Sequence, residues 1–322
     1  MQNLVTVFGG SGFVGTQVVR RLAKAGWRIR VAVRNPSLAN AMRLQGDVGQ
    51  IDVVQANIRD EDSTRRALEG ATACVNLVGV LYGVGRQTFQ AVHVDAARNV
   101  AQAAKAMGVT RFVQMSALGA DLDSPSGYAR TKAGGEAAVR AIYPDAVIVR
   151  PSVVFGQGDG FFNKFATMAA FSPALPLIGG GHTRFQPVFV GDVGLAFARI
   201  LSDPAAAGRT YELGGPSTAS FRELMEMMLA ETGRRRLLLP LPFPTAGVLG
   251  AAGDLVAGIL RPPVTSDQVL LLKADNVVGG DHPGLAELGI TPTALQAVLP
   301  TYLYRYRKGG QYADQETLAA AR

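Results

Sequence analysis

The first 22 residues constrain the fold more than any other stretch of the chain. Residues 4–8 are mostly apolar and are typical of a buried strand, and apolar residues recur at helical spacing up to Leu22. Between them, Gly9 allows a sharp turn, Gly12 lets the backbone approach a pyrophosphate, and Gly15 lets the helix pack closely. Since amides at a helix N-terminus bind anions, this strand–turn–helix unit predicts a nucleotide site rather than a plain structural turn.

Strand-like and helix-like segments alternate through the first half of the chain. We expect further strands at 28–33, 51–56, 73–78, 112–116 and 146–149, with helices at 61–68, 89–107 and 128–142. Repeated units of this kind predict an α/β fold, a Rossmann-type doubly wound parallel sheet with a smaller C-terminal α/β lobe. We place the nucleotide-binding domain at 1–152 with 185–202 returning to it, the smaller lobe at 153–308, and a polar tail at 309–322.

Composition narrows the choice of partner. The 322 residues are 48% hydrophobic and 18% charged, which is typical of a globular chain, and the net charge of +7 suits anionic partners or anionic lipid. No motif with interleaved basic and aromatic residues indicates nucleic acid. The single Cys74 lies in an apolar segment and fits a reducing compartment, and the three histidines lack metal-ligand spacing. Without a charged-then-apolar leader, the chain is expected in the cytoplasm.

The residues that follow the predicted strands indicate which dinucleotide binds. Arg34 stands where an acidic residue would bind the ribose 2′-hydroxyl of NAD, so it favours NADP(H), with NAD(H) as the alternative. An arginine on the surface without a ligand is the non-functional interpretation. The segment 57–60, which begins with Asn57, would lie beside the adenine or form an ordinary turn with an N-capping acid, and Gly79 would give the backbone room beside a cofactor or merely turn the chain. The predicted cofactor contacts are Gly9, Ser11, Gly12, Phe13, Val14, Gly15, Arg34, Asn57, Ile58, Val78 and Gly79.

A tyrosine and a lysine four residues apart carry the candidate chemistry. Tyr128 and Lys132 share one face of a predicted helix, and an ammonium near a phenol lowers the pKa of that phenol. The tyrosine then serves as a general acid or base toward a carbonyl or hydroxyl, and Ser116 would polarise the same oxygen. Because this spacing also occurs by chance, a pair on the helix surface is the alternative.

These residues resemble the short-chain dehydrogenase/reductase superfamily in its extended and atypical branches. The shared features are Gly9-x-x-Gly12-x-x-Gly15, Ser116, Tyr128-x-x-x-Lys132 and the segment 150–156. The resemblance implies that Tyr128 is the catalytic base, that Lys132 contacts the nicotinamide ribose, and that Ser116 orients the substrate. It also implies cofactor contacts at Tyr128, Lys132 and Pro151.

A closer resemblance covers nearly the whole chain. The segments 116–120, 128–136, 156–163, 186–193 and 282–289 are similar to the NADPH-binding accessory subunits of respiratory complex I. This implies a bound, structural NADPH and partners among complex I subunits at the membrane face. A free reductase, epimerase or dehydratase acting on a nucleotide sugar, a quinone or another small carbonyl is the alternative, because Tyr128 and Lys132 are both kept. Redox sensing without catalysis is a third interpretation.

The most apolar stretch runs from residue 237 to 260. Arginines flank it, at 234–236 and at 261, while Pro240 and Asp254 interrupt it, so we expect no membrane-spanning helix. Two interpretations remain open: a segment that contacts a partner or anionic lipid, which would make the protein peripheral on the inner face of the cytoplasmic membrane, and a buried helix. The aromatic and basic run 302–308 has the same two interpretations.

Overall fold

A computed structural model describes residues 3–257 and 264–312 and divides the chain into two compact units. The first comprises residues 1–151, 190–213 and 279–291, and the second comprises 152–189, 214–278 and 292–322. Residues 258–260 of the apolar stretch, its flanking Arg261 and residues 313–322 of the predicted polar tail lie outside the described residues. None of the helices that the structure describes is long and apolar enough to span a bilayer.

The first unit is built on a seven-stranded parallel sheet, which confirms the predicted fold class. The strand order is β11-β6-β5-β4-β1-β2-β3, and every neighbouring pair is parallel. All of β4 and all of β1 except its first residue are buried, as expected when helices cover both faces. The strands are β1 (Leu4–Phe8), β2 (Arg28–Val33), β3 (Ile51–Gln55), β4 (Ala73–Asn76), β5 (Arg111–Met115), β6 (Val147–Pro151) and β11 (Thr210–Leu213).

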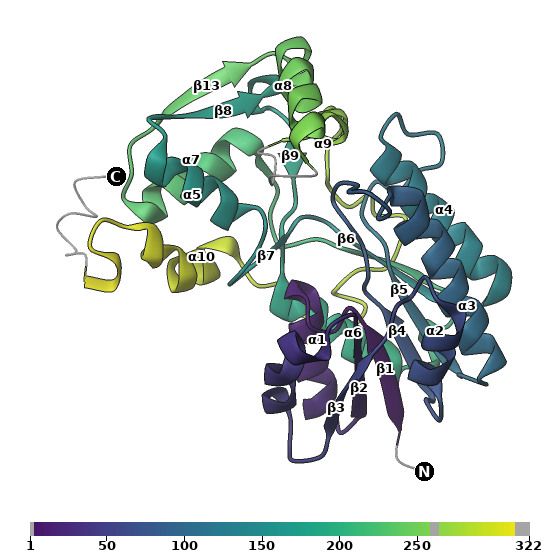
Figure 1. Cartoon of the computed structure of the whole chain (residues 1–322). Helices are drawn as coiled ribbons and strands as arrows, with labels where there is room; N and C mark the ends of the chain where they lie inside the picture. Colours follow the sequence, from purple (N-terminus) through teal and green to yellow (C-terminus); the bar gives the residue numbers. More distant parts are fainter. Residues whose placement is uncertain (1–2, 258–263, 313–322) are drawn as a thin grey trace. The chain divides into compact units, whose positions relative to one another are not determined.

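Helices cover both faces of this sheet (Figure 1). On one face α1 (Phe13–Lys24) packs on α6 (Val190–Ser202) so closely that a Cβ at Gly194 would lie 2.9 Å from the Gln17 backbone. On the other face lie α2 (Glu61–Leu68), α3 (Ala96–Ala106) and α4 (Gly127–Ile142). A π-helical turn precedes α3 at η2 (Gln90–Asp95), and 3-10 segments occur at η1 (Pro36–Gln45) and η4 (Pro204–Ala206).

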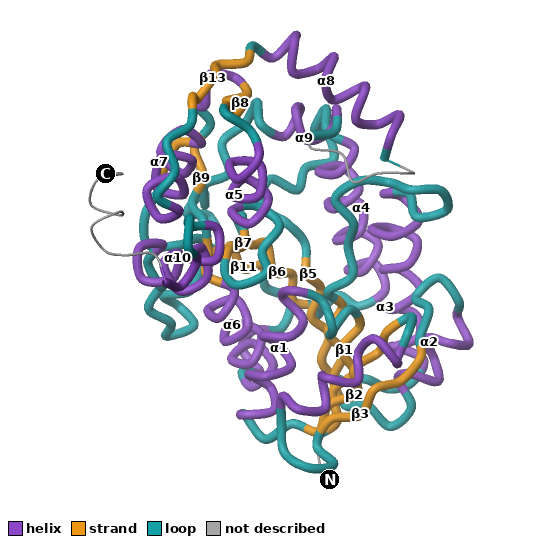
Figure 2. Tube along the Cα trace, turned by 60° about the vertical axis from the view of Figure 1, so that its left-hand side comes forward, coloured by secondary structure: helices purple, strands orange, loops and turns teal. Residues whose placement is uncertain are grey.

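The second unit combines short strand pairs with helices. Helices α5 (Phe162–Phe171), α7 (Phe221–Thr232) and α10 (Leu295–Leu303) bury a shared core rich in phenylalanine and methionine, and they lie together in Figures 1 and 2. The strand pairs are β7 (Val154–Phe155) with β10 (Val188–Phe189), β9 (Arg184–Phe185) with β12 (Ala219–Ser220), and β8 (Ala174–Ile178) with β13 (Leu237–Leu241). Helices α8 (Phe243–Val256) and α9 (Ser266–Leu271) and the 3-10 turns η3 (Gly179–Gly181), η5 (Tyr304–Tyr306) and η6 (Gly310–Tyr312) complete it.

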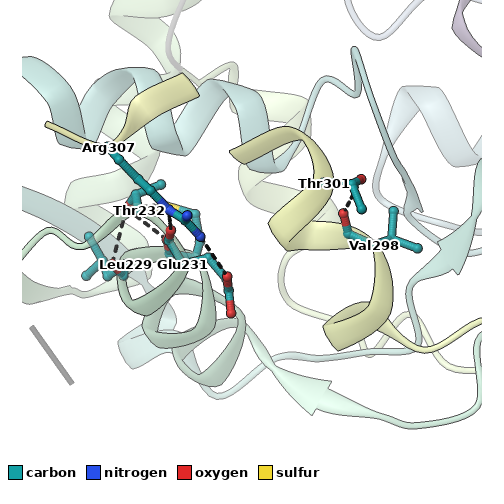
Figure 3. Close-up of polar contacts among 7 residues, drawn as sticks. Leu229, Glu231, Thr232, Val298, Thr301 and Arg307 are labelled. Carbon is teal, nitrogen blue, oxygen red and sulfur yellow. Dashed lines mark hydrogen bonds and ion pairs between the residues drawn. The ribbon is translucent and has the colours of Figure 1, made fainter. Parts of the chain in front are cut away.

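Polar contacts fix the ends of α7. Ser220 and Glu223 form the capping box that their spacing indicates. At the other end, the Arg307 Nε atom donates to the Glu231 carbonyl at 2.8 Å, and an Arg307 Nη2 atom lies 3.5 Å from the Glu231 carboxylate (Figure 3). The chain after α10 is therefore attached to α7 by a guanidinium rather than by apolar packing alone.

Candidate functional site

A cleft of about 310 Å³ opens at the carboxyl ends of the first unit's central strands. This is the edge of a doubly wound sheet at which ligands bind. Eight of the predicted cofactor contacts line it: Gly9, Ser11, Gly12, Arg34, Asn57, Ile58, Val78 and Gly79. Phe13, Val14 and Gly15 lie beside it in the first turn of α1, while Ser116, Tyr128, Lys132 and Pro151 are not among its lining residues.

The turn between β1 and α1 shows what each glycine does. Gly9 has a φ of +77°, which L side chains rarely adopt. A Cβ at Gly15 would lie 2.3 Å from the Gly9 oxygen, so α1 approaches the turn too closely for any side chain. By contrast, a Cβ at Gly12 would meet only the Gly9 oxygen, at 3.3 Å. Gly15 is therefore required by the protein's own packing, whereas Gly12 leaves space on the cleft side.

The first turn of α1 offers amides to a ligand. Gly12 is the N-cap and supplies no capping side chain, and the first turn contains no acidic residue. The leading N–H groups of a helix have no partner within the helix, and they carry its positive dipole end. This turn and the space at Gly12 fit a dinucleotide pyrophosphate.

The side of the cleft next to β2 and β3 is positively charged. Arg34 follows β2 and Arg59 follows β3, and both line the cleft, whereas none of its lining residues is an aspartate or glutamate. Arg59 was not among the predicted contacts, although it belongs to the segment 57–60 expected beside the adenine. The other lining residues that were not predicted are Ala32, Val33, Ala56, Leu77, Val80, Gln87 and Val92. Arg59 stands two residues after Asn57, so its proximity to the predicted adenine contact was the signal that could have identified it.

Lys132 lies at the strand-β4 side of this cleft. A Cβ at Gly79 would be 3.0 Å from the Lys132 Nζ atom, so a side chain here would shift the ammonium by a few tenths of an ångström. The side chain is buried, and Nζ donates a long hydrogen bond of 3.5 Å to the Met115 carbonyl. Burial lowers the pKa of Lys132 to about 8, although the charge of Glu136 opposes the shift.

Tyr128 and Lys132 do share one face of α4, as their spacing predicts. The Lys132 Nζ atom lies 5.8 Å from the centre of the half-buried Tyr128 ring. His93 meets that ring edge-on, with centroids 5.4 Å apart, and accepts a hydrogen bond from the Val80 amide at 3.1 Å. Burial, and then the Lys132 charge, lower the pKa of His93 to about 3, so the imidazole is neutral. His93 therefore contacts both Val80, which lines the cleft, and Tyr128 on α4.

Ser116 is the first residue after β5, and within the described part of the chain its backbone is hydrogen-bonded whereas its side-chain hydroxyl is not. Its amide donates to the Val149 carbonyl at 2.7 Å, which fixes the backbone beside β6. Its Oγ atom is buried and has no hydrogen-bond partner within the described residues. A buried hydroxyl without a partner is costly, so this atom suits a ligand that supplies one.

An ion network attaches α4 to the sheet through Glu136, one turn after Lys132. Arg150 on β6 donates two hydrogen bonds to Glu136 at 2.9 and 2.6 Å, and a further Arg150 nitrogen lies 3.6 Å from Glu212 on β11. The two carboxylates raise the pKa of Arg150. Glu212 also accepts from the Gly279 amide at 3.2 Å, which attaches the segment 279–291 to the edge of the sheet.

Comparisons with known proteins identify the family that the chain resembles. The sequence profile of the NAD dependent epimerase/dehydratase family matches residues 5–214. The chain is 35% identical over 316 residues to the mitochondrial NADH dehydrogenase (ubiquinone) 1 alpha subcomplex subunit 9 of Arabidopsis thaliana, over 95% of this chain and 79% of that protein. The subunit of the same name from Mus musculus is 35% identical over 306 residues, or 94% and 80%. The ceramide reductase of Caulobacter vibrioides is 32% identical over 272 residues, 81% of each.

Solved structures share the fold. The NADPH-dependent quinone oxidoreductase of Escherichia coli complexed with NADPH superposes with a TM-score of 0.70 at 24% identity, over 93% of this chain and 98% of that one. The dTDP-glucose 4,6-dehydratase DesIV of Streptomyces venezuelae, with NAD bound, gives 0.71 at 22% identity, over 98% and 99%. These likenesses show the architecture that the sequence predicts.

Proposed function

Because the chain belongs to the NAD dependent epimerase/dehydratase family, in the group that includes the complex I subunits it matches, we propose that it is a dinucleotide-holding accessory or assembly subunit of respiratory complex I. The observation that carries this proposal is 35% identity over 95% of the chain to a protein named as a subunit of NADH dehydrogenase. The partners would be complex I subunits at the inner face of the cytoplasmic membrane.

Extraction of membranes with a mild detergent tests the role as a subunit. The chain should co-purify with the membrane-bound NADH dehydrogenase, and Tyr128→Phe should not change this. Gly12→Trp should abolish co-purification, because the indole would fill the cleft that Gly12 lines and exclude the dinucleotide that the proposed subunit holds. Recovery of the wild-type chain only as a free protein would contradict the proposal.

We propose NADP(H) as the dinucleotide, with NAD(H) as the weaker ligand. Arg34 and Arg59 line the adenosine side of the cleft, and no carboxylate among the lining residues would accept a ribose 2′-hydroxyl. The pyrophosphate would lie on the amides of the first α1 turn. Gly79 would face the nicotinamide ribose, beside Lys132.

A free reductase is the second candidate function, and a specific observation favours it. Ser116 Oγ is buried and has no partner among the residues that the structure describes. Tyr128 and Lys132 lie on one helix face, and together these three side chains form the set that polarises a carbonyl and delivers a proton to it. The bound dinucleotide would supply the hydride. The 32% identity to a ceramide reductase adds support. If Tyr128→Phe abolishes a specific turnover while the dinucleotide stays bound, the chain is an enzyme.

We further propose that α8 lies on an anionic membrane surface. This helix buries its small residues Ala246, Gly250 and Gly253 against its own unit and exposes large apolar side chains, with Leu249 52% and Leu255 86% exposed. Arg235, exposed and just ahead of β13, would meet lipid phosphates.

Sedimentation with phosphatidylglycerol vesicles tests this contact. The double variant Leu249→Ser/Leu255→Ser should bind about tenfold more weakly, because each leucine loses its apolar contact. Leu44→Ser, at a position 83% exposed in the first unit, is the matched control and should bind like wild type. Equal binding by the double variant and wild type would contradict the proposal.

A further inference from the structure

One short turn holds two arginines against the adenosine side of the cleft. Val84 and Gln87 exchange two backbone hydrogen bonds, of 3.2 and 2.9 Å, which close the turn 84–87. The Gln87 Oε1 atom accepts from the Arg34 Nη1 atom at 2.9 Å, and the Arg86 carbonyl accepts from the Arg59 Nη1 atom at 3.0 Å. Two guanidiniums that follow different strands are thus attached to one turn.

None of the described carboxylates compensates the charge of these two guanidiniums. Their partners in the turn are neutral, an amide oxygen and a carbonyl oxygen. Within residues 3–257 and 264–312, no ion pair involves Arg34 or Arg59. A guanidinium has five N–H donors, and the turn occupies one of them on each arginine, which leaves others to bind an anion in the cleft.

We propose that the turn 84–87 determines the preference for a 2′-phosphorylated dinucleotide by holding Arg34 and Arg59 as a pair. Arg59 is then a second phosphate contact, and Gln87 is a positioning residue that orients Arg34. Two guanidiniums fixed in advance bind a dianion with a smaller loss of side-chain entropy than two free ones. The inference rests on the proposed function, because it concerns the phosphate of the proposed NADP(H).

Two adenosine fragments isolate this interaction. Adenosine 2′,5′-bisphosphate and adenosine 5′-monophosphate differ only in the 2′-phosphate, so calorimetric titration of the full chain with each measures the preference directly. We expect Arg59→Ala to weaken binding of the bisphosphate about tenfold and that of the monophosphate by less than about twofold. Gln87→Glu should do the same, because its carboxylate would pair with Arg34 and repel the phosphate.

Arg66→Ala is the matched control. Arg66 is an exposed arginine of α2 that does not line the cleft, so its removal lowers the net charge equally. It should change both affinities by less than about twofold at physiological salt, because exposed charges are screened. A thermal unfolding scan of each variant verifies that the fold is kept.

The outcomes separate this inference from the proposed function. If the wild-type chain binds neither fragment, or both equally, the assignment of NADP(H) is wrong. If wild type prefers the bisphosphate and Arg59→Ala or Gln87→Glu keeps that preference, the role of the turn is wrong and the NADP(H) assignment stands. Loss of the preference in Arg59→Ala and Gln87→Glu, but not in Arg66→Ala, supports the inference.

Discussion

Gly12 and Gly15 should respond differently to the same substitution. In Gly15→Ala the new methyl group would lie 2.3 Å from the Gly9 oxygen and 2.7 Å from two Gly10 backbone atoms, so turn and helix must separate by about 1 Å. Overpacking of this kind costs about 1–3 kcal/mol, and the contacts here are with rigid backbone. The better helix propensity of alanine returns about 1 kcal/mol at most, so we expect a net loss of about 2 kcal/mol.

Gly12→Ala should leave the fold nearly intact and weaken the ligand instead. The methyl group meets only one atom, at 3.3 Å, and the φ of −75° suits alanine, so the free energy of unfolding should fall by less than about 1 kcal/mol. Because Gly12 lines the cleft, the same methyl group should push the pyrophosphate away from the helix amides, with a loss of about tenfold or more in NADPH affinity.

The single tryptophan provides the assay. Trp27 is buried in the first unit, between α1 and β2, so its fluorescence during urea unfolding reports the stability of that unit. NADPH binding is measured by titration at low urea. Gly247→Ala is the control, because its Cβ would face open space in α8. If Gly15→Ala is as stable as wild type, or if Gly12→Ala binds NADPH normally, the reasoning about this turn is refuted.

Three further predictions concern the candidate catalytic side. Ser116→Ala should keep the free energy of unfolding or raise it by up to about 1 kcal/mol, because it removes a buried hydroxyl that has no partner in the described part of the chain, and a clear loss of stability would contradict this. The pKa of Lys132 is about 8 in the folded chain and 10.5 for an ordinary lysine, so between these pH values the folded chain binds fewer protons than the unfolded chain. The free energy of unfolding of wild type should therefore rise relative to that of Lys132→Met as pH increases from about 8 to 10.5. Equal pH profiles of the two chains in urea titrations would contradict this. Arg150→Met should cost about 3 kcal/mol in the Trp27 transition, since it leaves Glu136 and Glu212 buried without their cation, and a loss below about 1 kcal/mol would be inconsistent with the network.

Local patterns in the sequence predicted most of the first unit. The predicted helix at 61–68 coincides with α2, and the one at 128–142 begins a single residue after α4 does. Such helices are determined by residues close together in the sequence, and the helical period of their apolar residues can be read directly from it. The end of β2 at Val33 likewise placed Arg34 at the cleft. At 89–107, however, the expected single helix begins with a π-helical turn at Gln90–Asp95, which periodicity alone does not indicate.

The parts that were missed depend on contacts between distant segments. Arg59 and Gln87 reach the same cleft only because β4, β1, β2 and β3 are neighbours in that order in the sheet, and that order is a tertiary property. The segment 279–291 returns to the first unit through Glu212, far away in sequence. For the stretch 237–260 the sequence left burial and exposure open; small residues on the buried face of α8 and leucines on its exposed face become visible only once the helix is placed.

The nucleotide content of the chain purified with its native membrane complex tests the central claim most directly. After denaturation of the complex, mass spectrometry should find NADP(H) at about one equivalent per chain in wild type and in Tyr128→Phe, and almost none in Gly12→Trp purified on its own. A wild-type chain that carries no nicotinamide dinucleotide, and that binds neither NADPH nor NADH when they are added, would contradict the account.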